Sequence, residues 1–97
     1  MSFQKIKPIK SDAYLEYVRN LPSCISGRPS DDAHHIKGNG YGGTSKCSDI
    51  FTMPLTRDEH TILHNMGWLS WEREFGSQFG YCLRTIEQAI RDGVLNL

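Results

Sequence analysis

The four histidines of this chain all lie between Asp32 and His64, and their spacing constrains the fold more than any other feature. His34 and His35 precede a glycine-rich segment, whereas His60 and His64 follow it, four residues apart. Residues four apart on a helix share one face, with Cβ atoms roughly 5–6 Å apart. We therefore expect a helix that presents two imidazoles, and a neighbouring strand that brings a third to them.

The segment between the two histidine clusters has the composition of a short strand followed by a loop. We expect a strand over 33–37, and the glycines of 38–43 then tolerate positive φ angles that other residues resist. This loop is not a phosphate-binding P-loop, because Lys46 follows the last glycine by three residues and the surrounding elements have the wrong lengths. Nucleotide binding is therefore set aside.

A second strand and a helix are expected after the glycine loop. Residues 50–55 are rich in strand formers, and we expect Pro54 to end the strand or to confine it to a sheet edge. Thr56 and Glu59 fit a capping box, in which the threonine hydroxyl accepts the Glu59 amide and the glutamate reaches back. The helix that carries the second histidine pair should therefore begin at Arg57.

Three further helices are expected around this unit. The first begins at Ser11 and is stopped by Pro22, the second covers 69–75, and the last begins near Ser77 and ends at Gly93. Apolar stripes at helical spacing are usually core rather than platforms for stacked bases, so we assign them to the core. The core residues expected from the histidine-bearing helix and the last helix are Ile62, Leu63, Met66, Phe79, Cys82, Leu83, Ile86 and Ile90.

Composition bounds the remaining possibilities. A chain of 97 residues makes one small domain that buries roughly 60–65% of its unfolded surface. The formal charge is zero, so a polyanionic partner must be met by local basic clusters or by a bound cation. The odd number of cysteines and the lack of a secretory signal pattern favour a reducing cytoplasm. No apolar run approaches the roughly 20 residues that span a bilayer, so no membrane contact is expected.

The chain is expected to divide into a short arm and a single domain. Residues 1–10 carry three lysines and no acidic residue, and we interpret them as a basic, extended arm that is either a solvated tail or a strip of phosphate contacts. Residues 11–97 are expected to form one domain, because no linker, internal repeat or low-complexity tract separates them.

The histidines define the candidate chemistry. Two imidazoles four residues apart on a helix, with one more from an adjacent strand, supply three nitrogen ligands to a divalent ion and leave a position open for water or substrate. That is the pattern of a catalytic site. The alternative is that each histidine separately caps a helix, fills a polar gap or faces solvent. Their placement in two clusters of one strand-loop-strand-helix unit favours the metal site.

The order of the His34-His35 pair, the glycine loop, Asp49 and the helix from His60 to His64 resembles the HNH, or ββα-metal, endonuclease family. More specifically, the chain resembles phage-type HNH nucleases related to the recombination enhancement function (Ref) protein, a RecA-dependent nuclease. The segments that carry this resemblance are 14–19, 32–36, 38–43, 46–49, 54–55, 60–64 and 93–95. It implies an α+β fold, with a ββα-metal core over about 32–66 and N-terminal and C-terminal helices packed around it.

The resemblance also implies a role for each site residue. His35 would be the general base that takes a proton from the attacking water, and Asp49 would hold the loop and orient that imidazole. One divalent ion, zinc, magnesium or manganese, would be held by His34, His60 and His64, with Asp32 as a further candidate ligand. Because neighbouring strand residues point to opposite faces, His34 and His35 can share one site only if the strand ends or bends between them.

The implied activity is metal-dependent hydrolysis of phosphodiester bonds in DNA by an endonuclease of phage or prophage origin, in the cytoplasm of a bacterial host. The expected partners are DNA and, from the resemblance, a RecA-type recombinase filament. We expect phosphate contacts from basic residues of the arm and the site, namely Lys5, Lys7, Lys10, Lys37, Lys46 and Arg57. The alternative is a non-catalytic, metal-containing module that binds DNA or protein on the same fold.

Three departures separate this chain from the pattern of those relatives. Ser23 and Ser26 stand where a pair of cysteines is expected, Thr56 stands where cysteine is frequent, and Glu59 stands where histidine is frequent. A structural zinc knuckle is therefore not expected, so the small core lacks a metal staple. Formation of a homodimer through an apolar face would compensate for this.

Overall fold

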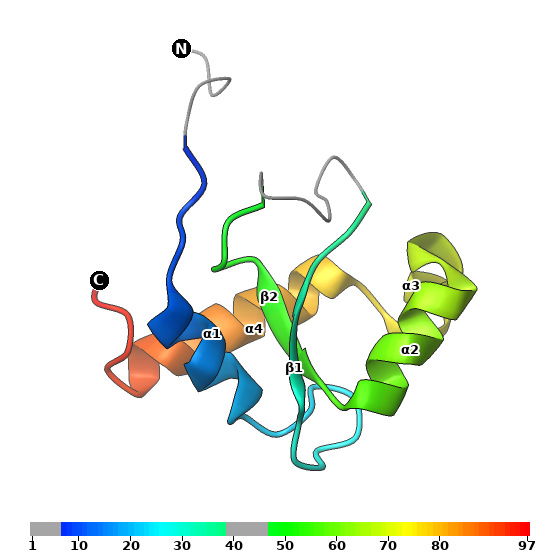
Figure 1. Cartoon of the computed structure of the whole chain (residues 1–97), viewed down its shortest axis with the longest axis horizontal. Helices are drawn as coiled ribbons and strands as arrows, with labels where there is room; N and C mark the ends of the chain where they lie inside the picture. The colour runs from blue at the N-terminus through cyan, green and yellow to red at the C-terminus, as the bar shows by residue number, and fades with distance from the viewer. Residues whose placement is uncertain (1–6, 39–46) are drawn as a thin grey trace.

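The computed structural model describes residues 7–38 and 47–97, which form a two-stranded antiparallel sheet and four helices (Figure 1). In chain order the elements are α1 (Asp12–Arg19), β1 (Asp32–His35), β2 (Thr52–Leu55), α2 (Arg57–Met66), α3 (Trp68–Phe75) and α4 (Gln78–Arg91). The fold is α+β, as the sequence predicts, and the helices lie before and after the strand pair.

Both strands have four residues and are shorter near the glycine loop than the sequence suggests. The strands expected over 33–37 and 50–55 lose the residues nearest that loop, although β1 begins one residue earlier, at Asp32. In place of the lost part of β2, the N–H of Phe51 donates to the carbonyl of Ser48 at 3.0 Å and closes a turn. The carbonyl of Phe51 still accepts the N–H of Ile36 at 3.0 Å, so one inter-strand hydrogen bond remains beyond the strand ends.

Pro54 lies inside β2, opposite Ala33, so it does not end the strand. Both strands of a two-stranded sheet are edges, where a residue without an N–H group is tolerated. The second of the two expectations for Pro54, confinement to an edge, therefore describes it. Its carbonyl accepts the N–H of Cys24 at 3.0 Å, which ties the preceding loop to β2.

The sheet has apolar residues packed on both faces. The buried residues form two clusters, one of Met53, Leu55, Leu63 and Trp71 and one of Tyr14, Val18 and Ala89. Met53 and Leu55, two apart in β2, share a face, whereas Ala33 packs against the second cluster on the opposite face. Helices α2 and α3 therefore cover one face, while α1 and the C-terminal half of α4 cover the other (Figure 1).

Helix α2 begins and ends as the sequence predicts. The hydroxyl of Thr56 accepts the N–H of Glu59 at 3.2 Å, and the Glu59 carboxylate accepts the N–H of Thr56 at 2.8 Å, which completes the capping box. Gly67 follows the helix with a φ of 82°, a left-handed value that glycine adopts without strain. The predicted start at Arg57 is therefore confirmed.

The assignment of several apolar helix residues to the core is wrong. Ile62, Met66, Phe79 and Leu83 are 38% to 51% exposed. In α2 the one buried residue is Leu63, whereas Ile62 and Met66 lie on its exposed side. The buried stripe of α4 consists of Gln78, Cys82, Thr85 and Ala89. Apart from Cys82, which belongs to both, each buried residue lies one position before a residue of the apolar stripe that the sequence predicts.

The residues that depart from the cysteine and histidine pattern are joined by hydrogen bonds. The Ser23 hydroxyl donates to the Glu59 carboxylate at 2.6 Å, on the oxygen that also accepts the N–H of Thr56. Burial acts to raise the pKa of Glu59, but hydrogen bonds from Ser23, Ser26 and Thr56 hold it below its usual range overall. This polar cluster connects the loop before β1 to the start of α2. It occupies the positions at which the relatives would carry the cysteines of a zinc knuckle.

The described part of the N-terminal arm is bound to the segment before β2. The N–H of Ile9 donates to the Ser48 hydroxyl at 2.9 Å, and the carbonyl of Ile9 accepts the N–H of Asp49 at 2.8 Å. The ammonium group of Lys10 donates to the carbonyl of Cys47 at 2.9 Å. Residues 9 and 10 are therefore joined to the domain by hydrogen bonds although both are exposed, whereas the prediction for residues 1–6 lies outside the described residues.

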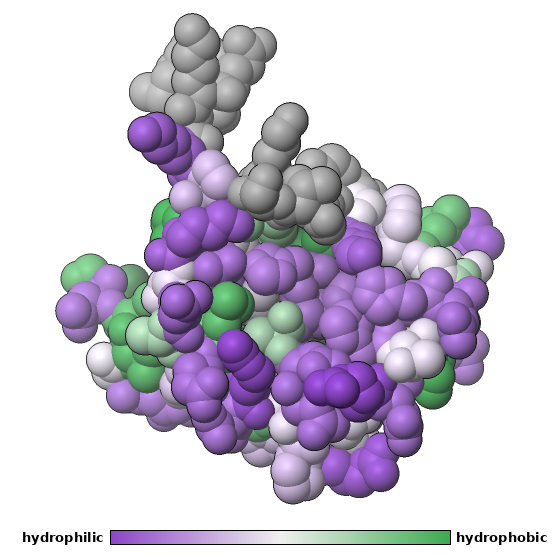
Figure 2. All heavy atoms as spheres, viewed as in Figure 1, coloured by the Kyte–Doolittle hydropathy of each residue, from purple (hydrophilic) through white to green (hydrophobic). Residues whose placement is uncertain are grey.

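The face shown in Figure 2 is mostly hydrophilic, with hydrophobic side chains in small separate groups. It shows no single large apolar patch, so on this face nothing in particular supports the homodimer, which stays a prediction. In the part of the chain that the structure describes, no helix is both long enough and apolar enough to cross a membrane.

Neighbouring residues of α2 should respond very differently to truncation. Leu63→Ala should lower the free energy of unfolding by about 2–5 kcal/mol, because the side chain is 1% exposed and packed against β2 and α3. Ile62→Ala, one position earlier and 45% exposed, should change it by about 0.5 kcal/mol or less. Urea denaturation of both variants measures the difference, and equal losses would contradict the assigned packing.

Candidate metal centre

The register of the sheet brings His34 to α2. His34 lies opposite Met53, so its side chain is on the face that α2 covers, and His60 and His64 lie one turn apart on that helix. His34 Nδ1 and His64 Nε2 each lie 3.0 Å from His60 Nε2. One ligand atom from each histidine lies within 4.8 Å of the others, so the group could hold a metal ion.

Asp32 lies behind His60 and sets its tautomer. Its Oδ2 atom is 3.0 Å from His60 Nδ1, and a carboxylate oxygen accepts hydrogen bonds but donates none. His60 Nδ1 therefore carries the proton, and Nε2 directs a lone pair toward the other two histidines. This carboxylate-histidine arrangement is common behind metal ligands.

Asp32 also binds Arg57 through two hydrogen bonds, of 2.9 and 3.0 Å. The hydrogen bond from Arg57 is the main reason that the pKa of Asp32 lies below its usual range, with a further contribution from His60 and opposition from burial. Both oxygens of Asp32 thus have partners outside the group of three histidines. The candidate role of Asp32 as a ligand stays a prediction, and the observed contacts favour support of His60.

His34 is 1% exposed and is held in its neutral form. Burial lowers the pKa of His34 from 6.5 to about 4, and the hydrogen bond with Gln78 opposes this shift without overcoming it. Burial also lowers the pKa of His64, with a contribution from the positive charge of Lys37. A metal ligand must be neutral imidazole, so these shifts keep both rings ready to bind at neutral pH.

The donor set fits a transition-metal ion. In a tetrahedral zinc site, ligand nitrogens roughly 2.0–2.1 Å from the ion are about 3.3 Å apart. Two of the three observed separations are 3.0 Å, close to this value, and all three lie within 4.8 Å. Nitrogen donors suit zinc and its neighbours, whereas magnesium prefers oxygen ligands. Three protein ligands also leave a coordination position for water or substrate.

His35 is held by a buried carboxylate on the other side of the strand. His35 Nε2 lies 2.9 Å from Asp49 Oδ1, and Asp49 Oδ2 accepts the N–H of Ser11 at 2.7 Å. Burial acts to raise the pKa of Asp49, but the hydrogen bonds from Ser11 and His35 lower it overall. Asp49 is therefore an anion that orients the His35 ring and leaves Nδ1 of that ring with a lone pair.

His34 and His35 do not share a set of contacts. Alternation along β1 directs them to opposite faces, and among the described residues the histidine group that could hold a metal does not include His35. The strand ends immediately after His35 rather than between the two histidines, so β1 lacks the break that was expected to be necessary for both to share one site. With its side chain 30% exposed at that end, His35 remains accessible from solvent.

The basic residues assigned to phosphate contacts differ in their surroundings. Lys5 and Lys46 lie outside the described residues, and Lys7 is exposed. The positive charge of Lys37 lowers the pKa of His34 and His64, so this lysine is electrostatically coupled to the metal centre.

Lys10 and Arg57 are already partnered. Lys10 donates to a backbone carbonyl and lies 3.9 Å from Asp49, while Arg57 forms its ion pair with Asp32. Contact with a phosphate would therefore require these two side chains to share or exchange partners. Lys37, by contrast, acts electrostatically on His34 and His64, because its positive charge lowers the pKa of both.

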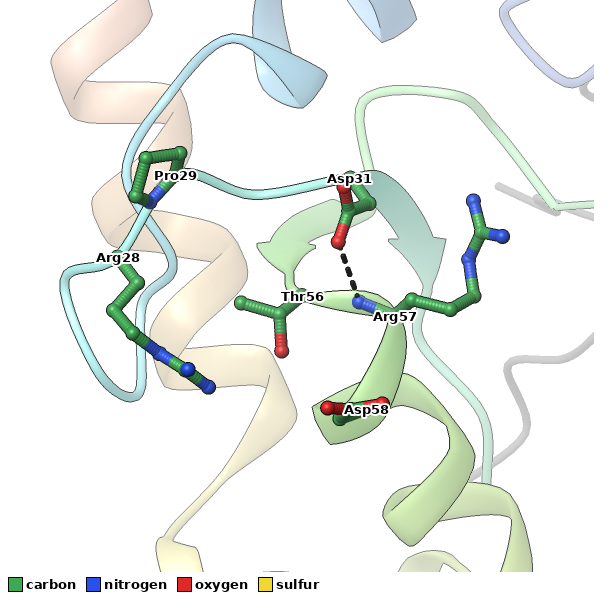
Figure 3. A pocket seen from close by; sticks show the side chains of 6 residues that line it. All are labelled: Arg28, Pro29, Asp31, Thr56, Arg57 and Asp58. Carbon is green, nitrogen blue, oxygen red and sulfur yellow. Dashed lines mark hydrogen bonds between the residues drawn. The ribbon is translucent and has the colours of Figure 1, made fainter.

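A hollow beside the start of α2 does not belong to the metal centre. Its lining residues are Arg28, Pro29, Asp31, Thr56, Arg57 and Asp58, which include none of the histidines (Figure 3). Asp31 accepts the backbone N–H of Arg57 at 2.8 Å, and the Arg57 side chain extends away from Arg28. The Arg57 guanidinium is paired with Asp32, so the charges left to the hollow are those of Arg28, Asp31 and Asp58, and it has no net positive charge to attract an anion.

Sequence reasoning missed Gln78, whose Oε1 atom lies 2.9 Å from His34 Nε2. The available signal was its phase, because Gln78 is four residues before Cys82 and in register with the buried stripe of α4. A buried carboxamide in such a stripe needs hydrogen-bond partners. The identity of those partners, however, depends on which strand the first turn of α4 meets.

Comparisons with known proteins find a matching family and a relative, and the description of neither states a function. Residues 1–93 match a family model described as "Protein of unknown function (DUF968)". The "Uncharacterized protein YdfU" of Escherichia coli (strain K12) is 35% identical over 96 residues, which cover 98% of this chain and 27% of that protein. The chain therefore spans about a quarter of the length of that relative. No solved structure matches the chain.

The metal-free protein should lose stability as the pH falls from 6.5 toward 4. The unfolded chain protonates His34 near 6.5, whereas the folded chain does so near 4, so in this window the unfolded state binds more protons. His34→Asn should flatten the dependence of the unfolding free energy on pH, measured by urea denaturation. His64→Asn is the control, since this exposed ring should account for less of the slope, and equal slopes in wild type and His34→Asn would contradict the assignment.

Proposed function

Because this chain belongs to the DUF968 family, whose description states no function, we propose an activity from its site: metal-dependent hydrolysis of phosphodiester bonds in DNA. The observation that carries the proposal is that His34, His60 and His64 could hold a metal ion, while the next residue of β1, His35, is bonded to Asp49. The order of these residues in a strand-strand-helix unit supports an HNH endonuclease, as the sequence resemblance implies.

In the proposed reaction His35 acts as the general base. Its Nε2–H donates to Asp49 Oδ1, so Nδ1 is the atom that accepts a proton from the attacking water. The water oxygen bonds to phosphorus, and the bond from phosphorus to the leaving 3′ oxygen breaks. Asp49 keeps the ring oriented and stabilises the imidazolium that forms.

The three remaining histidines would hold a divalent ion. When bound, such an ion would supply positive charge that stabilises the negative charge developing on the phosphate and on the leaving oxygen. Asp32 supports this arrangement by holding the His60 proton on Nδ1, and Lys37 would contact the negatively charged phosphate backbone. The recombinase filament and the phage or prophage context stay predictions from the resemblance.

A first experiment separates the base from the metal ligands. Wild type should bind one ion per chain and nick supercoiled plasmid with zinc, manganese or magnesium as the metal tested. His35→Ala should retain metal affinity and lose about 10²–10⁴-fold in nicking rate, the usual contribution of a positioned base. His34→Ala and His60→Ala should lose metal affinity itself, measured by calorimetry.

The same experiment contains the outcomes that contradict the proposal. Loss of metal from His35→Ala, together with retention in His34→Ala, would reverse the two roles. Metal binding by wild type without nicking under any metal would instead favour the alternative, a non-catalytic metal-containing module that binds DNA or protein. Metal affinity and nicking rate are measured separately, so a reversal of the two histidine roles can be distinguished from a protein that binds metal without cutting DNA.

A second experiment concerns DNA contact. Lys7→Ala and Lys37→Ala should each weaken binding to DNA and reduce the slope of log affinity against log salt by roughly 0.7–0.9, the value for one lost phosphate contact. Arg91→Ala is the control, because Arg91 pairs with Glu87 on α4. Affinity and salt slope unchanged in both lysine variants would contradict the assignment of these residues to phosphates.

A further inference from the structure

Gln78, the first residue of α4, is 1% exposed although it carries a polar carboxamide. Burial of an amide is unfavourable unless its donors and acceptor are bonded. Among the described residues, the Gln78 side chain has partners on β1, on the segment after β1 and on α3. These contacts explain its burial and give it a specific orientation.

The backbone of Lys37 determines which way the carboxamide faces. The N–H of Lys37 donates to Gln78 Oε1 at 3.2 Å, and Gln78 Nε2 donates to the carbonyl of Lys37 at 2.8 Å. A flipped amide would place its NH2 group against an N–H and its oxygen against a carbonyl. A second acceptor, Glu72 Oε2 at 3.4 Å from Nε2, favours the same orientation.

This orientation determines where His34 carries its proton. Gln78 Oε1 lies 2.9 Å from His34 Nε2, and an amide oxygen only accepts hydrogen bonds. Neutral His34 therefore has its hydrogen on Nε2 and a lone pair on Nδ1. The Nδ1 atom is the one that faces His60.

His60 is arranged in the complementary way. The Asp32 carboxylate holds the proton on His60 Nδ1, so His60 Nε2 also has a lone pair. The two lone pairs face each other across 3.0 Å, an arrangement that repels unless a cation lies between them. Without an acceptor at Nε2, His34 would move its proton to Nδ1, donate it to His60, and so block the metal-binding atom.

We propose that Gln78 is a positioning residue that holds His34 in the tautomer required for metal binding. Its carboxamide links the backbone of Lys37 to the ring of His34, so the two residues are held in one geometry. The inference rests on the metal site of the proposed function and not on DNA cleavage. It assigns to α4 a direct part in the chemistry of a site whose ligands come from β1 and α2.

The test compares two glutamines of the same helix. Gln78→Met keeps the size and shape of the side chain but removes the acceptor for His34 Nε2. Gln88→Met is the matched control, because the Gln88 amide is exposed and donates to Asp92 at 3.0 Å, far from the histidines in sequence. Unfolding midpoints of both variants show whether the fold is retained.

The first measurement is the tautomer of His34 in the metal-free protein, obtained from the ¹⁵N chemical shifts of its ring. Wild type and Gln88→Met should carry the proton on Nε2, whereas Gln78→Met should shift it to Nδ1. A change in overall packing alone would not move the proton between ring nitrogens. Wild type with the proton on Nδ1 would overturn the proposal, whatever the variants do.

The second measurement is affinity for zinc, by competition with a chelator. Gln78→Met should bind zinc about 10- to 100-fold more weakly than wild type, the usual effect of removing a partner behind a metal-bound histidine. Gln88→Met should bind as wild type does. Gln78→Glu should stay near wild type, because a buried carboxyl beside Glu72 favours its protonated form, which accepts from His34 and donates to the carbonyl of Lys37.

The outcomes distinguish this proposal from the proposed function. If wild type binds zinc and Gln78→Met binds it equally well, the role of Gln78 is wrong and the metal site stands. If wild type binds no zinc, nickel or cobalt, the metal site itself is wrong and this role falls with it. If zinc affinity falls in Gln78→Met and in Gln78→Glu alike, the glutamine acts through packing rather than through the His34 hydrogen bond.

Discussion

The pairing register of β1 and β2 is the constraint on which the rest of the site depends. His34 lies opposite Met53, and both side chains face α2. A slip by one residue would turn His34 to the face covered by α1 and would turn His35 toward α2. A slip that turned β2 over would separate Met53 and Leu55 from the residues of α2 and α3 against which they pack, so the core and the histidine group are determined by one set of backbone hydrogen bonds.

Each of three histidines has a dedicated acceptor outside the cluster. Asp32 serves His60, Gln78 serves His34, and Asp49 serves His35, each at 2.9 to 3.0 Å. These partners determine tautomers, and the tautomers determine which nitrogens are free for a metal or a proton. The cost is a polar interior, since α2 contributes one buried apolar residue, Leu63, to the core. The hydrogen-bonded cluster around Glu59 offsets part of this by joining α2 to the loop before β1.

Local signals were sufficient for much of the fold. The capping box at Thr56 and the glycine after α2 have local causes, and the structure has them where the sequence predicts. The buried stripe of α4 differs from the apolar stripe that the sequence predicts, because the apolar side chains of Phe79 and Leu83 are exposed and the polar side chains of Gln78 and Thr85 are buried. When the apolar stripe of a helix is weak, as in α4, the elements that pack against the helix decide which of its faces is buried.

The sequence by itself determined the element order, the helix caps and the spacing that lets His60 and His64 share a face, because these depend on contacts within about four residues. The tertiary structure decided that His34 meets this pair, that His35 turns to Asp49, and that Gln78 reaches His34 across 44 positions. Such contacts follow from strand register and helix packing, which bring together residues that no local pattern relates.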